Sequence, residues 1–358
     1  MRQLTTTRQQ KDGPKMSNDE LDCSRRLAKM RLGREDDIVK VVPNRAVAVV
    51  FHPAPSKLVV AVGDKTGAMG IVDVDDLAGD NDGVQRFDFH TGCVGSLEFN
   101  PSNTCQLYSA SYDDSVRCLD LSRGISTQVY LHPSETARLN YGRFSPTGDV
   151  LLLGDSQGVV TCLDTRAGGN KIAWAHNLAH GCKINTIDFC RNAPHYIVTA
   201  GNERCARIWD LRKTSSTPSK MSLADMPDTN SINSAFFSPT GADVIVCGYS
   251  DKLRLYNNPQ AQSGILMPTH EIFHNNKTGR FLSTFHASWC PTMPACFVVG
   301  SMNRPRQIEV FSTFRSKISH VMVYQSEFIG SVMSRSVFHP TLDVLGCTNS
   351  SGRLHILR

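Results

Sequence analysis

The chain has 358 residues, of which 40% are hydrophobic and 20% charged, and its net charge is +5 at pH 7. This composition is typical of a globular protein with a sizeable core. The charge excess permits a polyanionic partner but falls short of the strongly basic composition of many nucleic-acid binders. The polar start Met1-Arg2-Gln3-Leu4-Thr5 lacks the apolar region of a secretory signal, and no apolar run is long enough to span a membrane. We therefore expect a soluble, intracellular protein.

The twelve cysteines are scattered singly, with no C-x-x-C pair. This pattern favours buried, reduced thiols over disulfides or zinc ligands. The chain also lacks a Gly-rich phosphate loop and a nucleophile motif such as G-x-S-x-G. We therefore predict that the protein is not an enzyme and that it needs no cofactor.

The first 37 residues are predicted to form an extension, with 1–16 disordered and a short helix within 17–37. The helix is indicated by its acidic start, its basic later residues and Gly33 at its end, with Leu21, Leu27 and Met30 as one apolar stripe. Such a helix could lie on the rim of the domain or bind a partner, and the sequence leaves both open.

From residue 38 onward, an aromatic residue recurs seven times before a turn, at spacings of 45 to 52 residues. Alternating apolar residues precede it, and strand, turn and strand patterns follow, as in 58–63, 64–67 and 70–74. Units of this length with four short strands are typical of propeller blades, which bury their faces only by stacking around a ring. The seven anchors are Phe51, Phe99, Phe144, Phe189, Phe237, Trp289 and Phe338.

The fourth unit carries Trp209-Asp210, and with this dipeptide the chain resembles the WD-repeat family. We therefore predict an all-β fold, a seven-bladed WD40-type β-propeller spanning 38–358. The seventh unit ends after its third strand, so we expect the strand-like segment 38–42 to supply its fourth strand and close the ring.

In such a blade, the loop entering the first strand and the turn between the second and third strands lie on one face of the ring. We call this the entry face and the other the opposite face. A polyanion would be held by basic loops gathered on one face. The entry face is predicted to carry ten cationic residues, namely Arg45, Lys65, Lys183, Arg204, Lys252, Lys277, Arg280, Arg304, Arg306 and Arg335.

Acidic residues such as Asp64 share these turns, where an Asp is expected to bond the strand backbone. Four third-strand residues, Arg117, Arg207, Arg254 and Arg353, are interpreted as solvated, and His90 and His180 as core histidines. The long connection 268–282 contains an aromatic residue, histidines, amides and cations. It could insert side chains into a disturbed base stack, with Phe273-His274-Asn275 at its tip, or form an ordinary polar hairpin.

A more specific resemblance rests on His274-Asn275-x-x-Thr278-Gly279-Arg280-Phe281-Leu282, on Gly300-Ser301-Met302-x-Arg304-Pro305-Arg306 and on Val41-Val42-Pro43-x-Arg45. These motifs resemble the WD-repeat protein 76 family, which is related to damaged-DNA-binding protein 2. The resemblance implies a nuclear propeller of the DNA-damage response that binds double-stranded DNA with damaged or modified bases, including 5-hydroxymethylcytosine. The expected DNA-binding residues are Arg45, Lys65, Lys183, His274, Asn275, Lys277, Arg280, Arg304 and Arg306.

On the opposite face, Trp209-Asp210-Leu211-Arg212 resembles the WDxR box with which receptors of the cullin-4 ubiquitin ligase bind damage-binding protein 1. Leu163-Asp164-Thr165-Arg166 in the preceding unit is a weaker copy. The predicted docking residues are therefore Asp164, Arg166, Trp209, Asp210 and Arg212. The alternative function is a protein-only scaffold that binds histone tails or other chromatin proteins.

Overall fold

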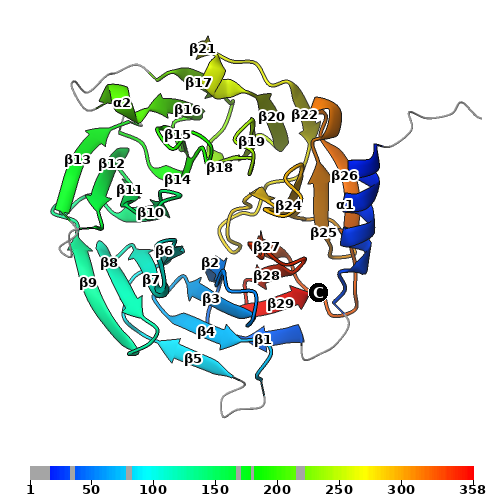
Figure 1. The fold of residues 1–358 in the computed structure, drawn as a ribbon, viewed down its shortest axis with the longest axis horizontal. Coiled ribbons are helices and arrows are strands. Elements are labelled where there is room, and N and C mark those ends of the chain that lie inside the picture. Colours follow the sequence, from blue (N-terminus) through cyan, green and yellow to red (C-terminus); the bar gives the residue numbers. More distant parts are fainter. Residues whose placement is uncertain (1–16, 33–36, 78–82, 167–170, 179–180, 215–221) are drawn as a thin grey trace, which may run out of the picture.

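The computed structural model describes residues 17–32, 37–77, 83–166, 171–178, 181–214 and 222–358. Within them the chain forms seven sheets around a central channel, which confirms the predicted seven-bladed propeller (Figure 1). The disorder predicted for 1–16, the helix end at Gly33 and the core position of His180 lie outside the described residues.

The four strands of each blade pair antiparallel, and the first strand lines the channel; in the fourth blade a fifth, short strand adds in parallel. The first three blades are β2 (Ala46–Phe51), β3 (Val59–Asp64), β4 (Met69–Asp73) and β5 (Val84–Phe87); β6 (Val94–Asn100), β7 (Asn103–Ser111), β8 (Ser115–Asp120) and β9 (Ile125–Leu131); and β10 (Leu139–Phe144), β11 (Val150–Asp155), β12 (Val159–Asp164) and β13 (Lys171–Asn177). The predicted strand, turn and strand boundaries of the first unit agree with β3 and β4 to within one residue.

The fourth blade is β14 (Ile184–Phe189), β15 (Tyr196–Gly201), β16 (Cys205–Asp210) and β17 (Ala224–Pro227). The short helix α2 (Leu211–Thr214) lies between β16 and β17, and β21 (Gly264–Ile265) extends the sheet beyond β17. The fifth and sixth are β18 (Ile232–Phe237), β19 (Asp243–Gly248), β20 (Lys252–Asn257) and β22 (His270–Phe273), then β23 (Ser288–Trp289), β24 (Cys296–Gly300), β25 (Ile308–Ser312) and β26 (Ser319–Tyr324). Two 3-10 turns, Pro259–Ala261 and Phe314–Ser316, lie in their connections.

The seventh blade is made from both ends of the propeller. It consists of β27 (Met333–Phe338), β28 (Leu345–Asn349), β29 (Arg353–Leu357) and β1 (Ile38–Lys40). β1 runs antiparallel to β29, with Ile38 opposite His355 and Lys40 opposite Arg353. Past the end of β1, the amides of Val41 and Val42 both donate to the Gly352 carbonyl, so the strand is shorter than the expected 38–42.

The core of the fold lies between neighbouring blades. All seven aromatic anchors are buried, with exposures from 3% to 7%. They occupy the last position of the first strand or lie beside it, where alternation points them into the adjoining blade. The anchors therefore form the packing layer that joins one sheet to the next.

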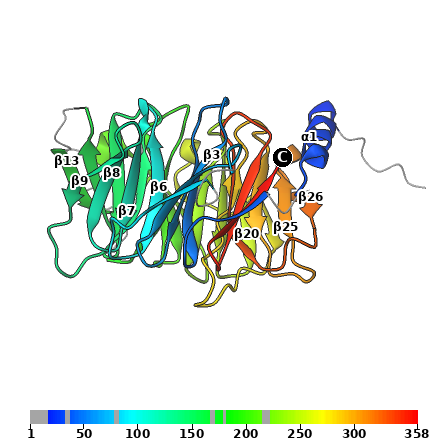
Figure 2. The same ribbon diagram turned by 90° about the horizontal axis from the view of Figure 1, so that it is seen from below.

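The helix α1 (Asn18–Lys29) lies outside the ring, beside β26 (Figures 1 and 2). Ser17 and Glu20 form a capping box at its start. Leu27 is fully buried and Met30 is 2% exposed, but Leu21 of the predicted stripe is 39% exposed and Cys23 is buried instead. The helix therefore covers the outer side of the sixth blade.

Candidate nucleic-acid interface

Four of the nine predicted DNA-binding residues converge on one cavity at the centre of the entry face. Arg45, Lys65, Lys183 and Arg280 line it together with Arg335, and its volume is about 370 Å³. No aspartate or glutamate is among the described residues that line it. Its walls therefore carry five cationic side chains with no carboxylate to neutralise them, which favours an anionic ligand.

The turn that carries Lys65 is held by the buried carboxylate of Asp64. Asp64 Oδ1 accepts hydrogen bonds from the amides of Thr66 (2.7 Å), Gly67 (3.0 Å) and Ala68 (3.1 Å). Its Oδ2 accepts from the amide of Asn44 at 3.1 Å, so one side chain fixes both the Lys65 turn and the loop ahead of Arg45. The expected structural role of an Asp at this position is confirmed.

Arg45 precedes β2 and joins the first blade to the connection between the fifth and sixth blades. Its Nη1 donates to the carbonyl oxygens of Arg280 (2.6 Å) and Leu282 (3.4 Å). Ser283 Oγ donates to the Ala46 carbonyl at 2.6 Å. These bonds fix the backbone of the connection at the rim of the cavity.

An exposed aromatic side chain stands at the same rim. Phe281 is 74% exposed, and the Arg280 guanidinium lies 5.0 Å from the centre of its ring. A cation above an aromatic face stabilises both side chains in one orientation. The sequence motif included Phe281, but gave it no role.

Lys183 precedes β14 and lies deeper in the cavity. Its ammonium contacts the hydroxyl of Tyr112 and lies 5.1 Å from the centre of that ring, and the Tyr112 hydroxyl donates to Asn140 Oδ1. Burial lowers the pKa of Lys183, and the Arg335 charge lowers it further. Burial raises the pKa of Tyr112 to about 12, so the phenol stays a neutral donor at pH 7. Sequence reasoning missed Tyr112 and Asn140, since neither is charged.

The expectation that His274 stands at the tip of an inserting hairpin is wrong. His274 is 6% exposed; its Nδ1 lies 2.7 Å from Asn276 Oδ1 and its Nε2 lies 3.4 Å from Glu309. Asn276 is itself fully buried and bonds the backbone of the β19–β20 turn. His274 and Asn276 therefore pack against neighbouring strands, whereas Phe273 (78% exposed) and Asn275 are exposed and are not among the described residues that line the cavity.

Three other predicted cations also lie outside the described lining of the cavity. Lys277 forms an ion pair with Asp251 at 2.9 Å. Arg306 donates to the Met302 carbonyl at 2.8 Å, and Arg304 is exposed beside it. Arg304 and Arg306 add positive charge around the entry face, whereas the charge of Lys277 is balanced by Asp251.

Two third-strand arginines are not solvated as interpreted from the sequence. Arg254 is 7% exposed and pairs with Asp228 and Glu271, and Arg207 pairs with Glu203 and Asp225. Asp225 and Glu271 lie on the fourth strands of the two blades, whereas Glu203 and Asp228 lie in loops that precede the arginines. Period-two alternation alone does not reveal these partners. His90 is a core histidine as predicted, with Nδ1 2.9 Å from Asp113 and Nε2 2.7 Å from Ser109.

On the opposite face, two Asp-Arg pairs stand at the ends of neighbouring third strands. Arg166 lies 2.7 Å from Asp164 and Arg212 lies 2.8 Å from Asp210, and both arginine side chains are more than 60% exposed. Trp209 does not join them, because alternation along β16 turns its side chain inward. It is 2% exposed and its Nε1 donates to Thr199 Oγ1 at 2.9 Å, so its predicted docking role is wrong.

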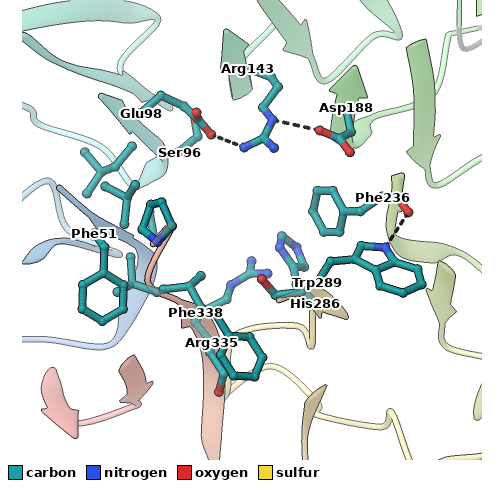
Figure 3. Close-up of a pocket in the computed structure, with 18 of the residues that line it drawn as sticks. Phe51, Ser96, Glu98, Arg143, Asp188, Phe236, His286, Trp289, Arg335 and Phe338 are labelled. Atoms are coloured by element: carbon teal, nitrogen blue, oxygen red, sulfur yellow. Dashed lines mark hydrogen bonds and ion pairs between the residues drawn. The ribbon is translucent and has the colours of Figure 1, made fainter. Parts of the chain in front are cut away.

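A second cavity of about 230 Å³ continues through the channel toward the opposite face. On one side of it, Arg143 pairs with Glu98 (2.7 Å) and Asp188 (2.9 Å) (Figure 3). On the other side, Arg335 lies beside His286 (Figure 3). The carboxylates of the channel are thus both engaged by one arginine.

Comparison with known proteins agrees with this architecture. The WD domain, G-beta repeat model matches residues 82–120 and 175–210. WD repeat-containing protein 76 of Xenopus laevis is 36% identical over 90% of this chain and 54% of its own length, and that of Mus musculus is 33% identical over 90% and 50%. DNA damage-binding protein CMR1 of Chaetomium globosum is 29% identical over 88% of this chain and 64% of its own length. The propeller belongs to the WD-repeat protein 76 family.

The chain spans about half the length of the WD-repeat protein 76 relatives it matches. The relatives include proteins named for binding damaged DNA. The names of the WD-repeat protein 76 and CMR1 relatives refer to no catalysed reaction. Within the described residues, no helix is both long and apolar enough to cross a membrane, and no three His, Cys, Asp or Glu side chains cluster as metal ligands.

Proposed function

We propose that this WD-repeat protein 76 family propeller binds double-stranded DNA through its entry face and acts in the DNA-damage response in the nucleus. The observation that carries the proposal is the cavity lined by Arg45, Lys65, Lys183 and Arg280 with no described carboxylate. Phosphate backbones supply most of the affinity of DNA binding and are met by such clusters of Lys and Arg. The names of the CMR1 relatives point in the same direction.

The rim of the cavity also suits recognition of disturbed or modified bases. The exposed ring of Phe281 offers a stacking surface, and the adjoining Arg280 offers a charge for the flanking phosphate. Damaged or modified base pairs cost less to unstack than intact ones, so a stacking residue favours them. We propose ultraviolet lesions or 5-hydroxymethylcytosine as the preferred targets.

Binding to undamaged, ultraviolet-irradiated and 5-hydroxymethylcytosine duplexes, measured by fluorescence anisotropy across a salt series, tests this function. Lys65→Glu and Arg280→Glu are expected to weaken binding at least about tenfold and to flatten the salt dependence by about 0.9 per lost phosphate contact. Lys57→Glu is the matched control for Lys65→Glu, because Lys57 is 70% exposed in the same blade but lies at the opposite face. Equal binding by parent and both entry-face variants would contradict the proposal and favour the protein-only chromatin scaffold.

We also propose that the opposite face binds damage-binding protein 1 of the cullin-4 ubiquitin ligase. Arg166 and Arg212 support this, because each is held by its own aspartate at equivalent places on adjacent blades. Such fixed, exposed guanidinium groups suit acidic or carbonyl partners. Co-purification with damage-binding protein 1 should be lost in the Arg166→Glu/Arg212→Glu variant and retained in Arg123→Glu, whose side chain is 75% exposed at the same face. Retention in the double variant would refute the docking.

A further inference from the structure

Arg335 is a buried cation at the junction of the two channel cavities. It lies on β27, the first strand of the seventh blade, and lines both the entry-face cavity and the cavity below it. The whole residue is 9% exposed. Any ligand that enters the entry-face cavity and reaches its floor therefore meets this guanidinium.

Among the described residues, Arg335 has no carboxylate partner. Its Nε and Nη1 have no hydrogen-bond partner there, and its Nη2 lies 3.5 Å from Thr284 Oγ1. Arg143 in the same channel differs, since Glu98 and Asp188 hold it at 2.7 and 2.9 Å. The two carboxylates of the channel thus neutralise Arg143 directly, whereas Arg335 keeps two unused donors.

The charge of Arg335 persists despite this burial. Burial lowers its pKa to about 10, which leaves it protonated at pH 7. Its charge in turn lowers the pKa of Lys183 and, together with burial, that of His286, so the floor of the cavity is positive. An unpaired buried charge costs several kcal/mol of folding free energy. Sites that keep such a cost are commonly those that use the group to bind a ligand.

We propose that the entry-face cavity receives a phosphomonoester group, which inserts until its oxygens pair with the unused donors of Arg335. A guanidinium matches two phosphate oxygens in a bidentate arrangement. Lys183 and Thr284 line the same cavity and supply a second charge and a hydroxyl for the remaining oxygens. The volume of about 370 Å³ lies within the range of pockets that hold small ligands.

A phosphomonoester can reach this depth more readily than a phosphate within a duplex. An internal phosphodiester is bonded on both sides to a backbone that stays at the rim, whereas a terminal phosphate has one free side. Two sources share this chemistry: the phosphorylated end of a DNA strand and a small free phosphate compound. The first source rests on the proposed DNA-binding function, and the second does not.

Titration calorimetry with inorganic phosphate and with pyrophosphate, at constant ionic strength in chloride, tests the pocket itself. We expect saturable binding by the parent, at least about tenfold weaker binding by Arg335→Gln, and intermediate binding by Arg335→Lys, which keeps the charge without the bidentate geometry. Without phosphate, Arg335→Gln should melt at the same temperature as the parent or higher, because it removes an unpaired charge. Phosphate should raise the melting temperature of the parent beyond its effect on Arg335→Gln.

The source of the phosphate is tested with one short duplex, prepared with 5′-phosphate or 5′-hydroxyl ends, and with relaxed closed-circular DNA. Tighter binding of the phosphorylated duplex that disappears in Arg335→Gln identifies strand ends as the source. Equal binding of both duplexes, with calorimetric phosphate binding intact, identifies a small phosphate compound. Unchanged binding of closed-circular DNA by Arg335→Gln separates this pocket from the general DNA interface.

The proposal fails if neither phosphate nor pyrophosphate binds the parent, or if Arg335→Gln binds them equally well. A marked loss of stability in Arg335→Gln without phosphate would also overturn it, since the arginine would then have a purely structural role. If phosphate binding depends on Arg335 while closed-circular DNA does not bind at all, the phosphate pocket is supported and the proposed DNA-binding function is refuted.

Discussion

A single carboxylate, that of Asp64, organises the turn beside the cavity. It accepts three amide hydrogen bonds within its own turn and a fourth from Asn44. Asp64→Ala is therefore expected to lower the free energy of unfolding by about 2 kcal/mol and to weaken DNA binding, since Lys65 loses its support. Urea denaturation and the anisotropy assay measure the two effects. An Asp64→Ala variant as stable as the parent would show that the turn forms without the carboxylate.

Buried histidines should make the propeller sensitive to mild acid. Burial lowers the pKa of His355 to about 4, and burial also lowers the pKa of His90 and of His339. In the unfolded chain a histidine titrates near pH 6.5, so for His355 the unfolded state binds a proton that the folded state does not between about pH 6.5 and 4, and the lowered pKa values of the other two act in the same direction. The stability contribution of these groups is thus complete above pH 6.5 and declines below it.

The expected decline is up to about 1.4 kcal/mol per pH unit for each such histidine. His355→Gln should reduce the slope of the unfolding free energy against pH by up to about 1.4 kcal/mol per pH unit, which corresponds to one proton. Urea denaturation at pH steps from 7 to 4.5 measures that slope. An unchanged slope in the variant would mean that His355 is protonated within the folded protein.

At this scale, the sequence predicted the charges of the site better than their surroundings. Arg45, Lys65, Lys183 and Arg280 were placed on the entry face by their position in the repeat, and they meet at the cavity. The burial of His274 was not predictable, because it depends on Glu309, a residue of the next blade. An interaction between residues of different blades leaves no recognisable pattern in the sequence around either residue, whereas the position of a residue in a turn of the repeat does.

Among the elements, α1 offers a direct test of what the helix contributes. Leu27 is fully buried against the sixth blade, and the Tyr324 hydroxyl donates to its carbonyl at 2.8 Å. Leu27→Ala should lower the free energy of unfolding by about 2–5 kcal/mol. Leu21→Ala is the control, since Leu21 is 39% exposed and should change stability by less than about 0.5 kcal/mol. Equal, small effects of both would show that the helix is not part of the cooperative fold.

The elements themselves were largely predictable, because each blade repeats one pattern. Alternation and turn residues located strands such as β3 and β4 to within one residue. The helix was predicted from its capping signals, but its buried face was not. Cys23 is buried there in place of Leu21. The contact of the helix with β26 and the Arg26–Asp343 ion pair at 2.5 Å fix which face is buried, and neither is local in sequence.

For the whole molecule, the pairing of β1 with β29 holds the ring shut. Val39 is 4% exposed in this closure, opposite Leu354. Val39→Asp buries a charge without a partner and should lower the free energy of unfolding by several kcal/mol. Hydrogen exchange of the β29 amides should accelerate more than that of β14, on the far side of the ring. Val323→Asp is the control, because Val323 is 40% exposed. Uniform acceleration would indicate that the ring opens only by global unfolding.

The same closure has a consequence for how the protein is made. Hairpins within the first six blades form between neighbouring segments and can fold while the ribosome is still elongating the chain. β1 is synthesised early, but its partner β29 appears only after some three hundred further residues. Until then β1 remains an unpaired edge, and the first and sixth blades lack their shared neighbour. The nascent chain therefore depends on protection of that edge for most of its synthesis, and premature termination within the last blade leaves an open ring that is exposed to aggregation and degradation.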